Sequence, residues 1–181
     1  AKKSREGFNH AGGEIIYEGP NWTLIRIKDQ GQVGKDAAIW YGGFHEYDQG
    51  ESRWCTSSPG LTYFNGYIKD GPLYVVYRLN DPKVAPETGL PVERYQFHFP
   101  STQFMDKDDR SIDLIKMLNG PMEELKEYFK PEFAKSLVTG DNKALKIDNF
   151  FVLKLIVDIS SIRDLTERIL SINVFYRSGL M

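Results

Sequence analysis

The fold is decided by one stretch near the middle of the chain, which begins Arg53-Trp54-Cys55-Thr56-Ser57-Ser58-Pro59-Gly60 and ends Leu73-Tyr74-Val75-Val76-Tyr77. Between these ends, Phe64 and Tyr67 stand three residues apart, which places both on one side of a short helix. Gly71-Pro72 ends that helix, because glycine accepts positive φ and proline cannot continue the hydrogen-bond ladder. The β-branched and aromatic run that follows predicts a buried strand. We expect the other segments to pack on this helix and strand.

The composition fits one globular domain, or one domain with a helical appendage, in a chain of 181 residues. Aromatic residues make up 13% of the chain, so a core can form without disulfides because each ring buries a large area. The net charge of −2 lacks the basic footprint of a protein whose main partner is nucleic acid. We therefore expect a main partner other than nucleic acid.

The sequence shows no sign of secretion or of membrane insertion. Its one cysteine, Cys55, cannot form an internal disulfide, so nothing requires an oxidising compartment. The longest apolar run, Phe150 to Leu153, is interrupted by Lys154 and is too short to span a bilayer. The charged first residues lack the apolar segment of a secretion signal. These features predict a cytoplasmic protein with no membrane partner.

Further strand signals lie on both sides of the central stretch. Residues 14–17 and 22–28 are joined by turn-forming residues and predict a hairpin. Residues 94–99 alternate and predict a strand, with residues 103–105 pairing back onto it. In that strand we expect one face to be buried, carrying Tyr95, Phe97 and Phe99. We expect the other face to be exposed, carrying Arg94, Gln96 and His98.

Helix signals complete the prediction of the fold. We expect Asp36 to cap a helix that ends at Gly42-Gly43, and Ser111 to cap another that ends at residue 118. Further helices are predicted over residues 121–130, 132–138 and 161–172. The fold class is therefore α+β, with a small, mainly antiparallel sheet and packed short helices. Residues 1–120 form the core domain, and residues 121–181 form a helical C-terminal part that belongs to the same domain or to an interface.

Cys55 is the first candidate for catalysis. A nucleophilic thiol needs a nearby base, and His45 and His98 are the available histidines. These residues define one hypothesis, a cysteine-dependent hydrolase or transferase. The competing interpretation is a small buried hydrophobic residue beside Trp54, which is the usual role of a free cysteine.

Metal and phosphate signatures are incomplete in this chain. The acidic residues Asp106, Asp108, Asp109 and Asp113 do not match a calcium loop, because Arg110 and Ser111 occupy its fifth and sixth positions. Histidine and cysteine lack the spacing of a zinc site. The segment from Gly31 to Lys35 lacks the length and the hydroxyl residue of a P-loop. We therefore expect no metal and no other cofactor.

The expected outer face of the strand at residues 94–99 offers a second functional hypothesis. Arg94 and His98 share that face, and Arg53 follows a polar segment that leads into the central stretch. Together they suit a nucleotide or another anion. The alternative is an ordinary solvated face of a one-sided sheet.

A longer pattern joins these segments. It comprises Trp54-Cys55-Thr56, Phe64-x-x-Tyr67, Gly71-x-Leu73-Tyr74-Val75, Tyr95-Gln96-Phe97-His98-Phe99, Gln103-Phe104-Met105-Asp106 and Asp109. This pattern resembles small proteins and domains of large bacteriophages and mobile elements, a family with no settled activity. The resemblance covers residues 37 to 113. It implies a viral or mobile-element origin, and hence a location in the host cytoplasm or in the virion.

The leading functional hypothesis is a non-enzymatic binding or assembly protein, which would be a virion component if it is phage-encoded. The aromatic-rich sheet and the lack of a complete catalytic set favour it. Residues 150–181 carry more apolar surface than a monomer usually leaves exposed, which favours self-association or a protein partner through this segment. The alternative is that these residues complete the core of their own chain.

Overall fold

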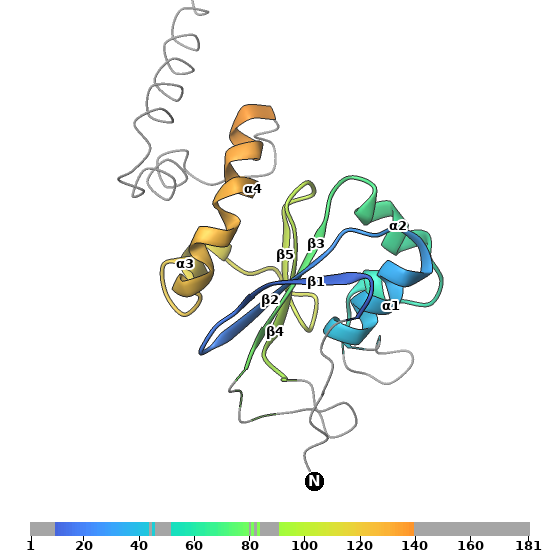
Figure 1. Ribbon diagram of the computed structural model, residues 1–181, viewed down its shortest axis with the longest axis horizontal. Helices are drawn as coiled ribbons and strands as arrows, with labels where there is room; N and C mark the ends of the chain where they lie inside the picture. The colour runs from blue at the N-terminus through green and yellow to red at the C-terminus, as the bar shows by residue number, and fades with distance from the viewer. Residues whose placement is uncertain are drawn as a thin grey trace, which may run out of the picture. The chain divides into compact units, whose positions relative to one another are not determined.

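The computed structural model describes residues 10–43, 45, 52–79, 81, 83 and 91–139, with side chains up to residue 133. Its centre is a five-stranded sheet in which the strands lie in sequence order (Figure 1). All neighbouring strands are antiparallel. The strands are β1 (Gly13–Glu18), β2 (Trp22–Ile27), β3 (Leu73–Arg78), β4 (Arg94–His98) and β5 (Gln103–Asp106). The α+β class and the antiparallel sheet expected from the sequence are confirmed.

Short helices lie on both sides of this sheet. They are α1 (Gly31–Gly42), η1 (Cys55–Ser57), α2 (Thr62–Ile68), α3 (Leu114–Leu118), η2 (Glu123–Leu125) and α4 (Lys126–Thr139). Figure 1 shows α1 and α2 on one side of the sheet and α3 on the other. Each face of the sheet is therefore covered, which decides how its polar residues are placed.

The face under α1 and α2 is apolar where β2 and β3 pair. Ile25 lies opposite Val75, and Ile27 lies opposite Leu73. These four side chains are fully buried. They form one cluster with residues of β3, α1 and α2, namely Tyr77, Ala37, Ala38, Tyr41, Phe64 and Ile68. The predicted helix and strand of the central stretch thus form this core, as expected.

The opposite face is lined by aromatic rings. Phe97 packs edge to face on Phe104 and Phe129, with ring centroids 5.8 Å and 5.7 Å apart. Trp22 donates its ring N–H to the carbonyl of Pro121 at 2.7 Å, so the chain beyond residue 120 packs on the sheet. The first compact unit runs from Ala1 to Glu132, and the second from Phe133 to Met181. The core therefore extends past the boundary that we expected at residue 120.

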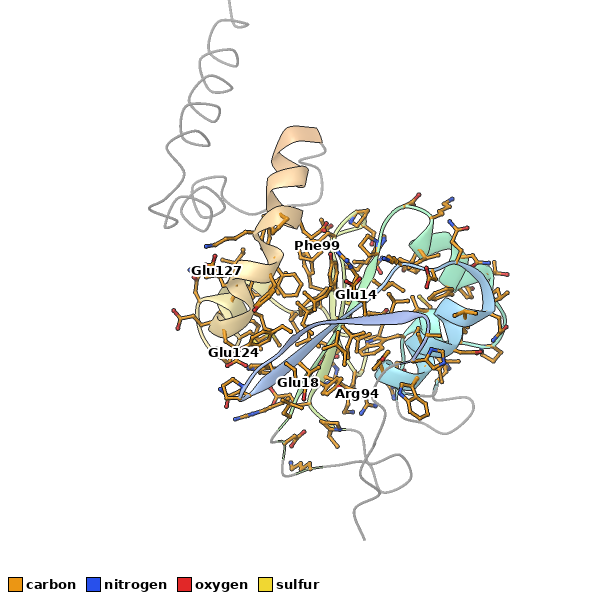
Figure 2. The ribbon with its side chains drawn as sticks, viewed as in Figure 1. Glu14, Glu18, Arg94, Phe99, Glu124 and Glu127 are labelled. Atoms are coloured by element: carbon orange, nitrogen blue, oxygen red, sulfur yellow. The ribbon has the colours of Figure 1, made fainter. Side chains whose placement is uncertain are left out.

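The β1–β2 hairpin is confirmed, and a carboxylate from η2 holds its tip. Glu124 accepts hydrogen bonds from the backbone N–H of Trp22 at 2.8 Å and from that of Asn21 at 3.3 Å. The label of Glu124 stands beside the hairpin in Figure 2. This contact links η2 to the hairpin turn across 103 residues of sequence, from Asn21 to Glu124.

Three helix predictions need correction. Helix α1 begins at Gly31, so Asp36 lies inside the helix and its side chain accepts a hydrogen bond from Gln32 at 2.6 Å. Helix α3 is capped by Asp113, which accepts the N–H of Lys116, and not by Ser111. A single helix, α4, continues through Pro131 where two helices were expected. The predicted helix at residues 161–172 and the apolar segment at 150–181 lie outside the described residues.

Candidate functional site

A small pit lies on the sheet where β4 and β5 pass under η1 and α2. Its lining residues are Trp54, Cys55, Tyr67, Gln96, His98, Gln103, Met105 and Asp109. Trp54, Gln96 and His98 are buried, whereas the other five are half-buried or exposed. The free volume of the pit is about 10 Å³, which is room for about one water molecule. It therefore fits one atom-sized group and not a whole ligand.

The segment that carries Cys55 is fixed by hydrogen bonds from distant residues. The buried Lys35 donates from Nζ to the carbonyl of Thr56 at 2.7 Å and also to the carbonyl of Ser58. The ring N–H of Trp54 donates to the carbonyl of Asp106 at 2.6 Å. These contacts tie η1 to α1 and to the end of β5. The thiol is therefore held at one position over the pit.

The thiol is hydrogen-bonded to a tyrosine. Cys55 Sγ lies 3.6 Å from the hydroxyl oxygen of Tyr67, which in turn donates to Gln103 Oε1 at 2.7 Å. Burial raises the pKa of the Tyr67 hydroxyl, so the phenol keeps its proton near neutral pH. Trp54 is buried as expected, with 1% of its surface exposed. Cys55 beside it is half-buried.

The ring of His98 packs against the ring of Tyr67, and the N–H group of the His98 ring points away from Ser101. Its Nδ1 accepts the backbone N–H of Ser101 at 3.3 Å and lies 2.7 Å from the hydroxyl of the same residue. This pattern assigns the proton of the neutral ring to Nε2. Burial lowers the pKa of His98, although the carbonyls of Tyr67 and Gly71 partly oppose that effect. Among the described residues, no hydrogen bond joins Cys55 to a histidine.

Gln96 contributes an unpaired donor to the pit. Its Oε1 accepts a hydrogen bond from the Thr56 hydroxyl at 2.8 Å, which assigns the other end of the amide as NH₂. That Nε2 is buried and has no hydrogen-bond partner within the described part of the chain. His98 Nε2 is also without a well-formed hydrogen bond to a described residue, but carbonyl groups lie near it. An unpaired buried donor costs about 1–3 kcal/mol, so Gln96 is the residue of the pit whose hydrogen bonding is least complete.

Asp109 stands at the rim of the pit. Its φ of +59° lies in the left-handed region, within a turn in which Asp106 accepts the N–H groups of Asp108 and Arg110, each at 2.9 Å. Burial raises the pKa of the Asp109 carboxyl, Asp106 adds to the rise, and His45 opposes it. None of the described residues donates a hydrogen bond to this carboxylate. The rim thus presents an acceptor in the same pit that Gln96 lines.

The prediction that the anion-binding face of β4 is exposed is wrong. The alternation along β4 is as expected, but the second face is buried, because Arg94, Gln96 and His98 are 2%, 7% and 3% exposed. Helices α1 and α2 and the η1 segment cover it. Arg94 lies at one end of β4 and Phe99 beyond the other (Figure 2). The guanidinium of Arg94 donates to the carbonyls of Gly42 at 2.8 Å and Pro91 at 2.7 Å, so it holds the end of α1 in place.

The other predicted site residues are only partly brought together. His98 and Cys55 line the same pit, and His45 is close enough to affect the charge of Asp109. Arg53 is exposed, and its backbone N–H donates to the carbonyl of Lys107 at 3.0 Å. It is not a lining residue of the pit.

Several lining residues were not predicted as site residues from the sequence. They are Trp54, Tyr67, Gln96, Gln103, Met105 and Asp109. One signal was available, since all eight lining residues belong to the pattern that carries the resemblance to phage and mobile-element proteins. That pattern joins segments far apart in the chain, and here its polar members meet at one place.

Metal and membrane sites receive no support from the part of the chain that the structure describes. Within it, no group of three histidine, cysteine, aspartate or glutamate side chains is placed to hold a metal ion. None of its helices combines the length and the apolar character needed to cross a membrane. Comparison with known proteins found no matching family model, no matching curated protein and no matching solved structure.

Proposed function

We propose that the protein is a non-enzymatic binding module that contacts its ligand at the pit beside Cys55. The observation that carries this proposal is the buried, unpaired NH₂ group of Gln96 in a pit with room for about one oxygen atom. Because buried donors are nearly always paired, an acceptor atom of a ligand is the natural partner for this group.

The hydrogen bonding of Cys55 favours recognition over catalysis. A cysteine nucleophile is activated by a base within hydrogen-bond reach of its sulfur. Here the partner of the sulfur is the hydroxyl of Tyr67, which passes its own hydrogen bond to an amide oxygen and is a poor proton acceptor. His98 uses Nδ1 for Ser101, packs its ring against that of Tyr67 with centroids 5.2 Å apart, and has the carbonyls of Tyr67 and Gly71 near its other nitrogen.

Side-chain amide signals in NMR spectra test the binding proposal directly. The ¹⁵N-labelled protein is titrated with acetamide, acetate and inorganic phosphate, and the Gln96 signals are assigned by their loss in Gln96→Met. We expect a saturable shift of the Gln96 signals with at least one probe. Gln32 is the matched control, since its amide is exposed and paired with Asp36. Unmoved Gln96 signals with all three probes would overturn the proposal.

A second measurement tests the absence of catalysis. The protein is incubated with p-nitrophenyl acetate and its intact mass is followed. We expect no stable acetyl adduct at Cys55 beyond that of the unfolded chain. A rapid burst of p-nitrophenol with one acetyl group on Cys55 would instead support the hydrolase or transferase hypothesis.

A further inference from the structure

We infer that the pit takes an amide group, with the carbonyl oxygen of the ligand on Gln96 and the neighbouring N–H of the ligand on Asp109. This inference rests on the proposed function and specifies the chemistry of the ligand. A primary carboxamide, a secondary amide and a ring lactam share this group. A carboxylate and a phosphate lack the N–H donor.

The donor half of the site is fixed by Thr56. Its hydroxyl donates to Gln96 Oε1 at 2.8 Å, and in this orientation of the amide the NH₂ group is the end that has no partner among the described residues. Gln96 and Thr56 are 7% and 1% exposed, respectively, which leaves little competing solvent. The pit therefore presents N–H groups and requires an acceptor.

The acceptor half of the site is the carboxylate of Asp109. Of the two basic residues close to it in sequence, Lys107 is paired with Asp108 at 2.7 Å. Arg110 and Arg53 also act on the carboxyl of Asp108, where they help to lower its pKa. The negative charge of Asp109 is thus available to a ligand, and it is reinforced by Asp106, which helps to raise the pKa of Asp109.

This charge decides between ligands that all carry an acceptor oxygen. A carboxylate or a phosphate would bring a second negative charge to the rim and would be repelled by Asp109. An amide brings no net charge and supplies an N–H for the carboxylate. Its planar shape also suits the pit, because the oxygen fits the water-sized space while the nitrogen stays at the rim.

The walls of the pit provide apolar contact for the rest of the group. Tyr67, Met105 and Trp54 all line it. Sulfur and aromatic carbon atoms make weak contacts with a planar amide and do not compete for its hydrogen bonds.

The test compares amide and carboxylate probes of the same size on the full-length protein. Acetamide and acetate are titrated while the Gln96 amide signals are followed, with N-methylacetamide and uracil as the secondary-amide and lactam arms. We expect acetamide to bind at least about fivefold more tightly than acetate at neutral pH, because exposed like charges interact by about 1 kcal/mol at short range.

The Asp109→Asn variant separates charge from shape. Its side chain keeps the size of aspartate and tolerates the left-handed backbone, so the turn is retained. We expect the preference for acetamide to fall to about equal binding or to reverse. Asp108→Asn is the matched control, because that carboxylate is paired with Lys107 and does not line the pit; we expect it to leave the preference unchanged.

The outcomes distinguish the inference from the proposed function. Tighter binding of acetate than of acetamide by the unmodified protein overturns the amide inference and leaves the binding function standing. An unchanged preference in Asp109→Asn also overturns it. If no probe moves the Gln96 signals, the proposed function fails as well.

Discussion

Replacing the buried hydrogen-bonded pair Thr56 and Gln96 by apolar residues of similar shape should stabilise the protein. The perturbation is the double variant Thr56→Val with Gln96→Met. In the native protein the pair makes one hydrogen bond, from the Thr56 hydroxyl to Gln96 Oε1 at 2.8 Å, while Gln96 Nε2 has no partner among the described residues. The double variant removes the hydrogen bond and the unpaired donor together.

The magnitude follows from two opposing contributions. The hydrogen bond contributes about 0.5–1.5 kcal/mol to the free energy of unfolding, whereas an unpaired buried donor costs about 1–3 kcal/mol. The double variant should therefore gain about 1 kcal/mol. Thr56→Val alone leaves both ends of the Gln96 amide unpaired and should lose about 1–3 kcal/mol. Gln96→Met alone strands the Thr56 hydroxyl but relieves the amide, so its stability should stay close to that of the native protein.

Urea unfolding of the four proteins completes a double-mutant cycle. A double variant that is less stable than the native protein by more than about 1 kcal/mol would refute the reasoning, since the amide would then be well paired in solution. The same variant should also lose acetamide binding, followed through the side-chain amide signals of Gln103 because position 96 no longer carries an amide, and this loss without unfolding separates recognition from stability.

Four further predictions concern core burial, thiol reactivity, the charge of Asp109 and self-association. Phe97→Ala should lower the free energy of unfolding by about 3–5 kcal/mol in urea melts, and His98→Ala by about 1–3 kcal/mol, because both residues are buried. An effect of His98→Ala near zero would contradict the burial of His98. The half-buried Cys55 should react with iodoacetamide in the native state, more slowly than in urea but measurably, and complete protection would mean that the thiol is closed off. Asp109→Asn should raise the free energy of unfolding at neutral pH, because burial raises the pKa of Asp109 above 3.8 in the folded state and so disfavours its ionised form. This gain in stability should disappear as the pH falls through that raised pKa. A gain that grows at low pH would contradict the expected direction of the pH dependence. Deletion of residues 150–181 should leave a folded protein and reduce self-association in light scattering if that segment is an interface, whereas failure to fold would assign it to the domain.

The strands and the helix of the central stretch could be predicted because their signals are local. The hairpin turn after β1, the glycine and proline before β3 and the alternation along β4 each lie within a few residues of the element that they define. By contrast, the start of α1 depends on tertiary packing. A Cβ at Gly34 would come within 1.8 Å of the carbonyl oxygen of Asp29 and within 2.9 Å of the Phe64 ring, so glycine is needed there for the close approach of the preceding backbone and of α2.

The burial of the second face of β4 could not be predicted, for a related reason. Its cover is placed by hydrogen bonds across large sequence separations, 21 residues between Lys35 and Thr56 and 52 residues between Arg94 and Gly42. Cys55 and His98 could be named as candidates from their chemistry alone. Gln96 could not, because a glutamine on an alternating strand is usually solvated and its role here depends on what covers it.

Two features that destabilise the folded state occur at the same pit, and this coincidence is the strongest argument that the pit has a function. The unpaired NH₂ of Gln96 and the left-handed backbone of Asp109 each disfavour the folded state. Glycine at position 109 would form the same turn with less strain, and an apolar residue at position 96 would need no partner. The other described non-glycine residue with positive φ, Thr102, closes a turn onto Phe99 at 3.0 Å, as Asp109 closes one onto Asp106 at 3.1 Å, so only Asp109 combines this backbone with a place in the pit. At the pit, each substitution that would stabilise the fold also removes a hydrogen-bonding group that the proposed ligand would contact, which is the relation expected between stability and binding.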